Sequence, residues 1–178
     1  MFLVSWAEAR RGELPAYEET LFRAVNRSSD RIRVPVRAVM QAGTFGTVPA
    51  VSILALLFGR KRLAASLAVG GTMAWLGAKL AKPFGGRERP QGVLEDVTIR
   101  EGIEGDLGWV SGHTAVATTI AFVASEELPR AVRPALAEVV GVVGFGRMYV
   151  GAHLPHDVVG GAGLGMMISA VIPPAEGR

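Results

Sequence analysis

An uninterrupted stretch of 21 residues without a charged side chain most strongly constrains how this chain can fold. It reads AVMQAGTFGTVPAVSILALLF and occupies positions 38–58. A helix needs about 20 predominantly apolar residues to cross the hydrocarbon core of a bilayer, which is about 30 Å thick. The basic sequence GRKR follows directly and is typical of a helix end at the membrane surface. We therefore interpret 38–58 as a membrane-spanning helix.

Four further apolar runs follow along the chain, at 63–81, 107–125, about 135–150 and 158–174. The sequence 82–106 between two of them is too highly charged to enter lipid. Hydrophobic residues make up 49% of the chain and charged residues 20%, a balance on the membrane side of ordinary globular usage. We expect one all-α domain, 1–178, containing a polytopic bundle of about five transmembrane helices over 38–174. A soluble all-α protein with buried helices is the alternative.

The first 36 residues precede this bundle and contain the amphipathic segment PAYEETLFRAVNRSSDRIR. Leu21, Phe22, Val25 and Ile32 fall near one face at helical spacing. We expect an amphipathic helix on the membrane surface, with its arginines toward the headgroups. A helix packed on the rest of the fold is an equal alternative. The segment lacks the basic head, apolar core and cleavage site of a signal peptide.

Alternate crossing of the membrane would sort the ends of the five runs between two faces. The turns at 59–62 and 126–134 would share one face with the C-terminus. The N-terminal helix, the 82–106 loop and the 151–157 turn would share the other. Histidines and cations would then gather on that second face, where ionisable groups are costly and usually mark a functional site. The residues concerned are Lys82, Arg89, His113, Arg147, His153, His156 and Asp157.

Two short sequences on this second face contain groups suited to an anion. KPFGGRERP places Lys82 and Arg89 around two glycines, and a guanidinium with an ammonium suits phosphate. A pair of lipid-headgroup anchors is the alternative. In VSGHT, Ser111 and Gly112 would offer a hydroxyl and backbone N–H groups at a helix start, beside His113. A serine N-cap with an incidental histidine is the alternative there.

A third sequence, GRMYVGAHLPHD, adds Arg147 and two histidines. His153 and Asp157 are four residues apart, which lets the carboxylate bond one imidazole nitrogen and leave the other as a nucleophile. A metal site formed by His153, His156 and Asp157 is the competing interpretation. The nearby cations would repel a divalent metal and attract a phosphate. We therefore favour an anion site without a metal, and assign His156 a structural or helix-capping role.

In this order, the three motifs closely resemble the signatures of the type 2 phosphatidic acid phosphatase superfamily. Its members share a helical bundle with soluble acid phosphatases and vanadium-dependent haloperoxidases. The family pattern is a lysine, six residues and Arg-Pro; then Pro-Ser-Gly-His; then Ser-Arg, five residues, His, three residues and Asp. This chain departs from it at Val110, where proline is usual, and at Gly146, where serine is usual. Both positions concern backbone shape or supporting hydrogen bonds, so we expect them to affect substrate fit more than chemistry.

The resemblance implies a metal-independent phosphatase, without a cofactor, that hydrolyses a lipid phosphate monoester or diphosphate through a phosphohistidine. His153 would attack phosphorus, Asp157 would orient His153, and His113 would protonate the leaving oxygen and then activate water. The implied ligands of the phosphoryl oxygens are Lys82, Arg89, Ser111, Gly112 and Arg147.

The implied partners are membrane lipids, with a polyprenyl-type or a glycerolipid phosphate as substrate. We lean toward the polyprenyl type, because the short chain resembles the compact bacterial members. The implied location is multi-pass in the cell membrane, as in a bacterial plasma membrane. Family members usually face the site outward. Lys and Arg residues are more numerous on the site face, with seven before position 38 as well as Arg87 and Arg100, than on the opposite face, with six, which mildly favours a cytoplasmic site. Sidedness and oligomeric state are left open, with a homodimer among the alternatives.

Other functions fit the sequence less well. Nucleic-acid binding is not expected, because the basic residues are not interleaved with aromatic ones and the net charge is only +3. The absence of cysteine removes disulfides, thiolate metal sites and a cysteine nucleophile. A non-catalytic membrane lipid-binding or structural protein with a lapsed site remains an alternative, although no essential motif residue is missing. Soluble vanadium haloperoxidases are much longer and less apolar.

Overall fold

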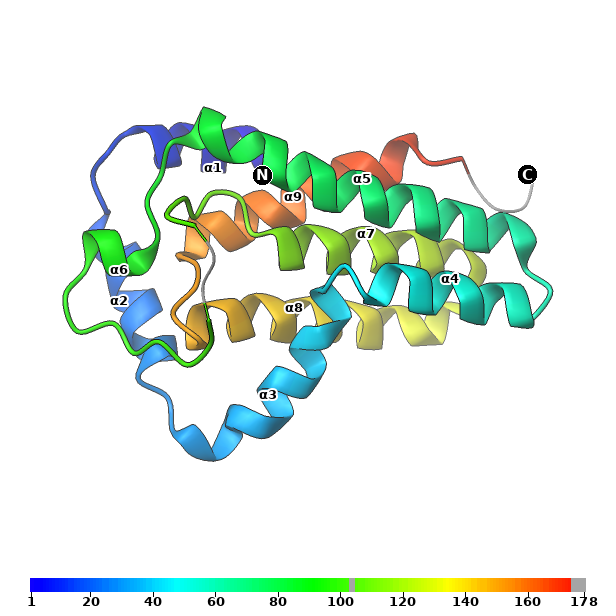
Figure 1. Ribbon diagram of the computed structural model, residues 1–178, viewed down its shortest axis with the longest axis horizontal. Helices are drawn as coiled ribbons and strands as arrows, with labels where there is room; N and C mark the ends of the chain where they lie inside the picture. Colours follow the sequence, from blue (N-terminus) through cyan, green and yellow to red (C-terminus); the bar gives the residue numbers. More distant parts are fainter. Residues whose placement is uncertain (103–104, 174–178) are drawn as a thin grey trace.

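The computed structural model describes residues 1–102 and 105–173, and these residues form an all-helical bundle, as the sequence predicts (Figure 1). Residues 103–104 of the predicted polar loop and residue 174, the predicted end of the fifth apolar run, lie outside the described residues. The longer helices of the bundle are α4 (Thr47–Leu57), α5 (Lys61–Gly85), α7 (Gly112–Glu127), α8 (Arg133–Tyr149) and α9 (Pro155–Val171). The shorter elements are α1 (Phe2–Arg10), α2 (Ala16–Asn26), η1 (Asp30–Ile32), α3 (Arg33–Met40), η2 (Gln41–Gly43), α6 (Pro90–Val93) and η3 (Arg130–Val132).

Helix α7 lies at the centre of the bundle and packs against α5, α8 and α9. Its contact with α9 is close because α9 presents glycines to it. A Cβ atom on Gly165 would lie 2.6 Å from the carbonyl oxygen of Ala115 and 2.7 Å from Cβ of Thr118. A Cβ atom on Gly161 would collide with the carbonyl oxygen of Ser111. These two glycines, four residues apart, let the two helix backbones approach directly.

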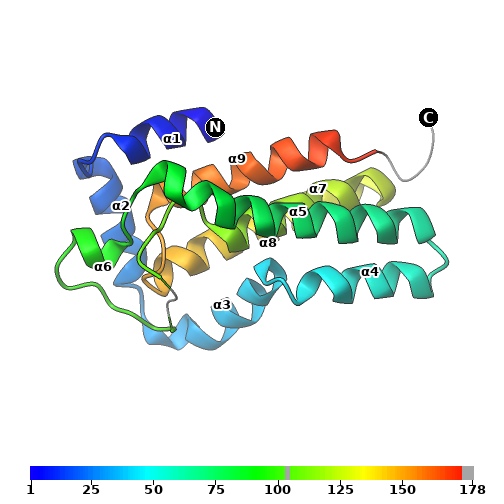
Figure 2. The same cartoon turned by 45° about the horizontal axis from the view of Figure 1, so that its top comes forward.

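The ends of the helices are sorted between two ends of the bundle, as the alternating arrangement predicts. In Figures 1 and 2 the α4–α5 and α7–α8 connections lie at one end, with the end of α9. Helices α2 and α6 and the connection from α8 to α9 lie at the other end. The three motifs lie at this second end, because α5 and α8 end there and α7 and α9 begin there.

The stretch 38–58, predicted as one helix, is broken in the structure. Helix α3 ends at Met40 and is continued by η2 to Gly43, and α4 begins at Thr47. The segments Asp30–Gly43 and Thr47–Leu57 are bent by 70° relative to each other. The break lies where Gly43 touches the start of α7, since a Cβ atom there would be 2.6 Å from the carbonyl oxygen of His113. The extended Thr44 redirects the chain, and its hydroxyl donates to the carbonyl oxygen of Gln41. Pro49 falls in the first turn of α4, where its missing N–H costs little.

The N-terminal segment packs on the bundle. Helix α2 contacts α8 and α9 and buries Phe22, which is 1% exposed, and Val25, while Leu21 is half exposed. Asn26 at its end is buried and donates to the carbonyl oxygens of Thr98 and Tyr149. Of the two interpretations of this segment, the packed helix describes α2. Helix α1, which the sequence did not predict, lies against α9.

Among the described residues, α5 by itself meets the length and hydropathy of a membrane-spanning helix. The bent pair Asp30–Gly43 and Thr47–Leu57 meets them when both halves are taken together, which makes two at most. Helices α7, α8 and α9 have 16, 17 and 17 residues, and thus extend for about 25 Å. The number of five crossings therefore stays a prediction.

We expect Gly165→Leu to lower the thermal midpoint of unfolding in detergent by several degrees, because the new side chain would force α7 and α9 apart. Overpacking of this kind typically costs about 1–3 kcal/mol. Gly141→Leu in α8 is the matched control, since Gly141 is exposed and no atom outside its own helix turn lies within 4 Å of its Cβ position. Equal losses in the two variants would contradict the assigned contact.

Candidate active site

The three motifs meet around one cavity of about 430 Å³ at the end of the bundle. Lys82 reaches it from the last turn of α5, and Arg89 from the residue that precedes α6. His113 lines it from the first turn of α7, Arg147 from the last turn of α8, and His153 from the connection between α8 and α9. Side chains from positions 71 residues apart in the sequence therefore face one space.

Two further predicted residues lie behind the wall of this cavity, while Gly112 lines it. Asp157 is fully buried, next to His153. Ser111 is fully buried as well, and its Oγ accepts hydrogen bonds from the backbone N–H and the hydroxyl of Thr114. The Ser111 side chain thus caps α7, as the alternative interpretation of this motif held, but His113 is not incidental, because it lines the cavity.

His153 and Asp157 form a buried pair. Oδ2 of Asp157 lies 3.5 Å from Nδ1 of His153 and accepts a hydrogen bond of 2.9 Å from the backbone N–H of Leu154. Since Nδ1 faces the carboxylate, Nε2 is the ring nitrogen left for the cavity. Burial, with the charges of Arg147, Lys82 and Arg89, holds the pKa of His153 well below its usual value. The ring is therefore neutral at neutral pH and keeps a lone pair.

Backbone carbonyl groups orient two of the cations. Nζ of Lys82 donates to the carbonyl oxygen of Leu107 at 2.7 Å. Nε of Arg89 donates to the carbonyl oxygen of Gly105 at 2.7 Å, and its Nη1 to that of Ala152 at 2.8 Å. These contacts with carbonyl oxygens fix both side chains at the wall of the cavity.

Arg147 has an unsatisfied donor next to the cavity. Its Nη1 lies 3.3 Å from a carboxylate oxygen of Glu101, but its buried Nε has no hydrogen-bond partner among residues 1–102 and 105–173. Buried polar groups in native structures are nearly always paired, so an orphan donor beside a cavity indicates a ligand that accepts from it.

Part of the cavity wall was not predicted. Gly43, Thr44 and Phe45 line it from the break between α3 and α4, together with Trp75 and Lys79 of α5. The rings of Phe45 and Trp75 lie 4.7 Å apart, and Nζ of Lys79 lies 3.9 Å from the Trp75 ring centroid. Gly43 and Gly46, which flank Thr44 and Phe45, are the sequence feature that could have predicted this break. The interpretation of 38–58 as one continuous helix left them without a role.

His156 lies away from the cavity, in a polar contact with α2. Its backbone N–H donates to Oε1 of Glu18 at 2.8 Å, its Nδ1 lies 3.1 Å from Oε2 of Glu18, and its Nε2 lies 3.2 Å from the hydroxyl of Tyr17. In the described part of the chain, no three histidine or acidic side chains are arranged to hold a metal ion. The ligand set of His153, His156 and Asp157 is therefore not assembled.

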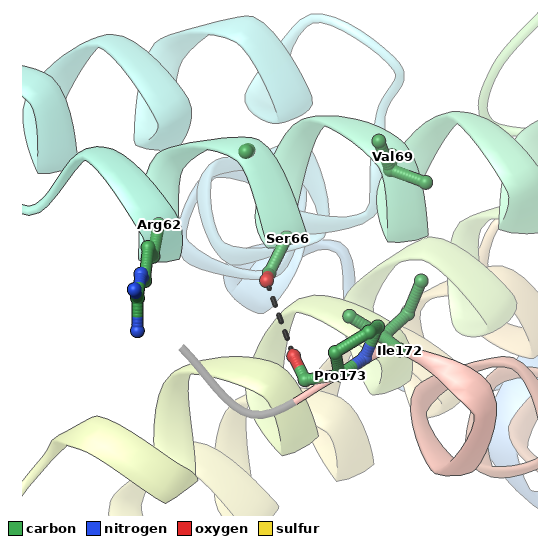
Figure 3. A pocket seen from close by; sticks show the side chains of 6 residues that line it. Arg62, Ser66, Val69, Ile172 and Pro173 are labelled. Atoms are coloured by element: carbon green, nitrogen blue, oxygen red, sulfur yellow. Dashed lines mark hydrogen bonds between the residues drawn. The ribbon is translucent and has the colours of Figure 1, made fainter. Parts of the chain in front are cut away.

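A second cavity, of about 460 Å³, lies beside α5 at the opposite end from Lys82 (Figure 3). There the hydroxyl of Ser66 donates to the carbonyl oxygen of Pro173. Arg62 is its one charged lining residue among those described, and the remaining lining residues are Ala65, Val69 and Ile172. Among the described residues, this cavity lacks the convergent titratable groups of the first.

Comparison with known proteins supports the same fold. The model of the PAP2 superfamily matches residues 61–177, a range that contains all three motifs. No curated protein matches the sequence. The crystal structure of Aquifex aeolicus LpxE is similar with a TM-score of 0.80 and 26% identity, over 88% of this chain and 94% of that one. A second similar structure is that of the first transmembrane PAP2 type phosphatidylglycerolphosphate phosphatase from Bacillus subtilis. Its TM-score is 0.81 at 19% identity, over 96% of this chain and 90% of that one.

We expect inorganic phosphate to raise the thermal midpoint of the wild-type protein and not that of Arg147→Ala, because the variant lacks the guanidinium group whose Nε has no partner among the described residues. At 100 times the dissociation constant, binding would stabilise the fold by about 2.7 kcal/mol. Arg62→Ala, in the second cavity, serves as the control and should respond like the wild type. A shift that survives in Arg147→Ala would locate the anion elsewhere.

Proposed function

The chain belongs to the PAP2 superfamily and is a phosphatase, and we propose that it hydrolyses a lipid phosphate monoester or diphosphate at the cavity that its three motifs share. The observation that carries this proposal is the convergence of the three cationic side chains of the motifs and two imidazoles on that cavity. The cations suit a phosphoryl group, and the imidazoles suit the transfer of that group and of a proton.

The proposed reaction has two steps. Nε2 of His153 attacks phosphorus in line, so that a P–N bond forms while the bond from phosphorus to the lipid oxygen breaks. His113 gives its proton to the leaving lipid oxygen. His113 then takes a proton from water, whose oxygen attacks phosphorus and breaks the P–N bond, which releases inorganic phosphate. Asp157 stabilises the charge that His153 acquires as the phosphohistidine.

Charge stabilisation is the proposed role of the remaining motif residues. Lys82, Arg89 and Arg147 would bind the equatorial phosphoryl oxygens, where negative charge resides in the transition state. The backbone N–H of Gly112, at the positive end of the α7 dipole, adds a further donor. Ser111 supports this donor by capping α7. Three cations supply the charge that a metal ion provides in other phosphoryl-transfer sites, so the proposed mechanism needs no cofactor.

A lipid substrate is proposed because the outside of the bundle is apolar. Leu57, Phe58, Leu80 and Phe84 are each at least two-thirds exposed, and a protein in water rarely exposes many large apolar side chains. We propose that the broken pair α3–α4 and helices α5, α7, α8 and α9 cross the cell membrane. A phosphate headgroup would then enter the cavity at the membrane surface while its chains stay in the bilayer. Polyprenyl and glycerolipid phosphates both meet this description.

We expect His153→Ala to lower turnover by at least about 1000-fold on every substrate that the wild type hydrolyses, because the nucleophile is gone. Phosphate release should be measured with a panel of polyprenyl and glycerolipid phosphates in detergent. The thermal midpoint of the variant verifies that it is folded. Phosphate release near the wild-type rate would remove the phosphohistidine mechanism.

Vanadate should inhibit the enzyme, and EDTA should not. Vanadate adopts a five-coordinate geometry that mimics the phosphoryl centre during transfer, so the cations that hold phosphate also hold vanadate. Initial rates of phosphate release with each compound test both statements. Activity that is lost on chelation and restored by a divalent metal would revive the metal-dependent alternative.

A further inference from the structure

A buried ion pair connects the N-terminal helix α2 to the motif region. Nη1 and Nη2 of Arg87 donate to the two carboxylate oxygens of Glu18 at 2.9 and 2.6 Å. The Glu18 side chain is fully buried, and that of Arg87 is 8% exposed. The family pattern specifies neither residue. Arg87 is one of the six variable residues between Lys82 and Arg89, and Glu18 lies outside all three motifs. Burial of two charges is costly unless their geometry is close to ideal, as the bidentate pair is here.

The same arginine faces the back of the candidate active site. Its Nη1 lies 3.7 Å from Oδ1 of Asp157. This oxygen is buried and has no hydrogen-bond partner among the described residues, whereas Oδ2 faces His153 and the N–H of Leu154. Arg87 is thus the cation in ion-pair contact with the oxygen of Asp157 that is turned away from the imidazole. Its charge offsets the burial of that carboxylate.

Glu18 also fixes the start of the helix that carries Asp157. One of its oxygens accepts from the backbone N–H of His156, and the other lies 3.1 Å from Nδ1 of His156. This backbone N–H belongs to the first turn of α9, where a helix has no internal acceptor for it. A carboxylate at this position is also favoured by the helix dipole. Glu18 therefore holds both Arg87 and the first turn of α9.

We propose that Glu18 and Arg87 are positioning residues of the phosphatase. Glu18 orients Arg87, and Arg87 neutralises the buried charge of Asp157 and holds its carboxylate against Nδ1 of His153. The inference rests on the roles proposed above for His153 and Asp157. When His153 gains positive charge as the phosphohistidine, Asp157 must remain an ionised and fixed carboxylate to stabilise that charge. Helix α2, which precedes the range matched by the family model, thereby contributes one positioning residue, Glu18, to the site.

The test compares Arg87→Met with Arg87→Lys. We expect Arg87→Met to lower kcat by on the order of 10- to 100-fold and to leave KM within about threefold, because Arg87 does not line the substrate cavity. Arg87→Lys keeps a positive charge near Asp157 and should recover part of kcat. A purely structural role would reduce the amount of folded protein and leave kcat per folded molecule unchanged.

Two adjacent glutamates of α2 provide a matched control for the other half of the pair. Glu18→Gln removes the buried charge and should lower kcat. Glu19→Gln makes the same change one residue later, where Glu19 and Arg23 form a partly exposed pair on the surface of α2. We expect Glu19→Gln to retain wild-type kcat. Equal effects of the two substitutions would overturn the proposal.

A double-mutant cycle separates this inference from the proposed function. If Arg87 acts through Asp157, Arg87→Met should cost little further kcat in an Asp157→Asn background, because the group on which it acts is already neutral. A loss that stays equally large in that background overturns the positioning role alone. Wild-type turnover in Asp157→Asn itself would instead overturn the proposed mechanism. Thermal midpoints of all four proteins should accompany the rates.

Discussion

The close approach of α7 and α9 at their first turns is the contact on which the candidate site depends. The backbone N–H of Ser111, just before α7, donates to the carbonyl oxygen of Asp157 at 2.9 Å. Gly161 and Gly165 make this approach sterically possible, because a side chain at either position would meet the α7 backbone. The contact brings the motif that contains His113 and the motif that contains His153 to one place. The close packing of α7 against α9, whose start follows His153 by two residues, depends on the absence of these two Cβ atoms.

Charges are divided between the front and the back of the site. The cavity side carries Lys82, Arg89 and Arg147, whereas the buried carboxylate of Asp157 lies behind His153 with Arg87 as its counter-ion. In the proposed function, the positive charge of these side chains attracts a phosphoryl group and stabilises its transition state. The ion-pair contact with Arg87 lowers the cost of burying the Asp157 carboxylate behind His153. The imidazole of His153 therefore lies between the buried Asp157 carboxylate and the cavity that is proposed to bind the phosphoryl group.

The N-terminal segment and the polar loop brace this arrangement from outside the bundle. Arg100 donates to the Asp30 carboxylate and to the carbonyl oxygens of Asn26 and Tyr149, which ties the loop to α2 and α8. The loop then carries Glu101 and Gly102 to the cavity wall. Gly146, where the family usually has serine, lies against Met40 of α3, so the missing side chain is replaced by contact with the broken helix. These contacts join segments that precede the matched family range to the site within it.

Local pattern by itself determined the helical fold class, the two groups of helix ends and the residues that line the cavity from the three motifs. Hydropathy and residue spacing act over one turn or one helix, so they can be read without knowing what packs against what. Tertiary contacts decided the rest. The 38–58 helix breaks just after Gly43, which packs against the backbone of His113, 70 residues away in the sequence. Glu18 and Glu19 are identical in chemistry and adjacent in sequence. Only the fold buries one of them against Arg87 and leaves the other at the surface, because burial depends on partners that no local pattern specifies.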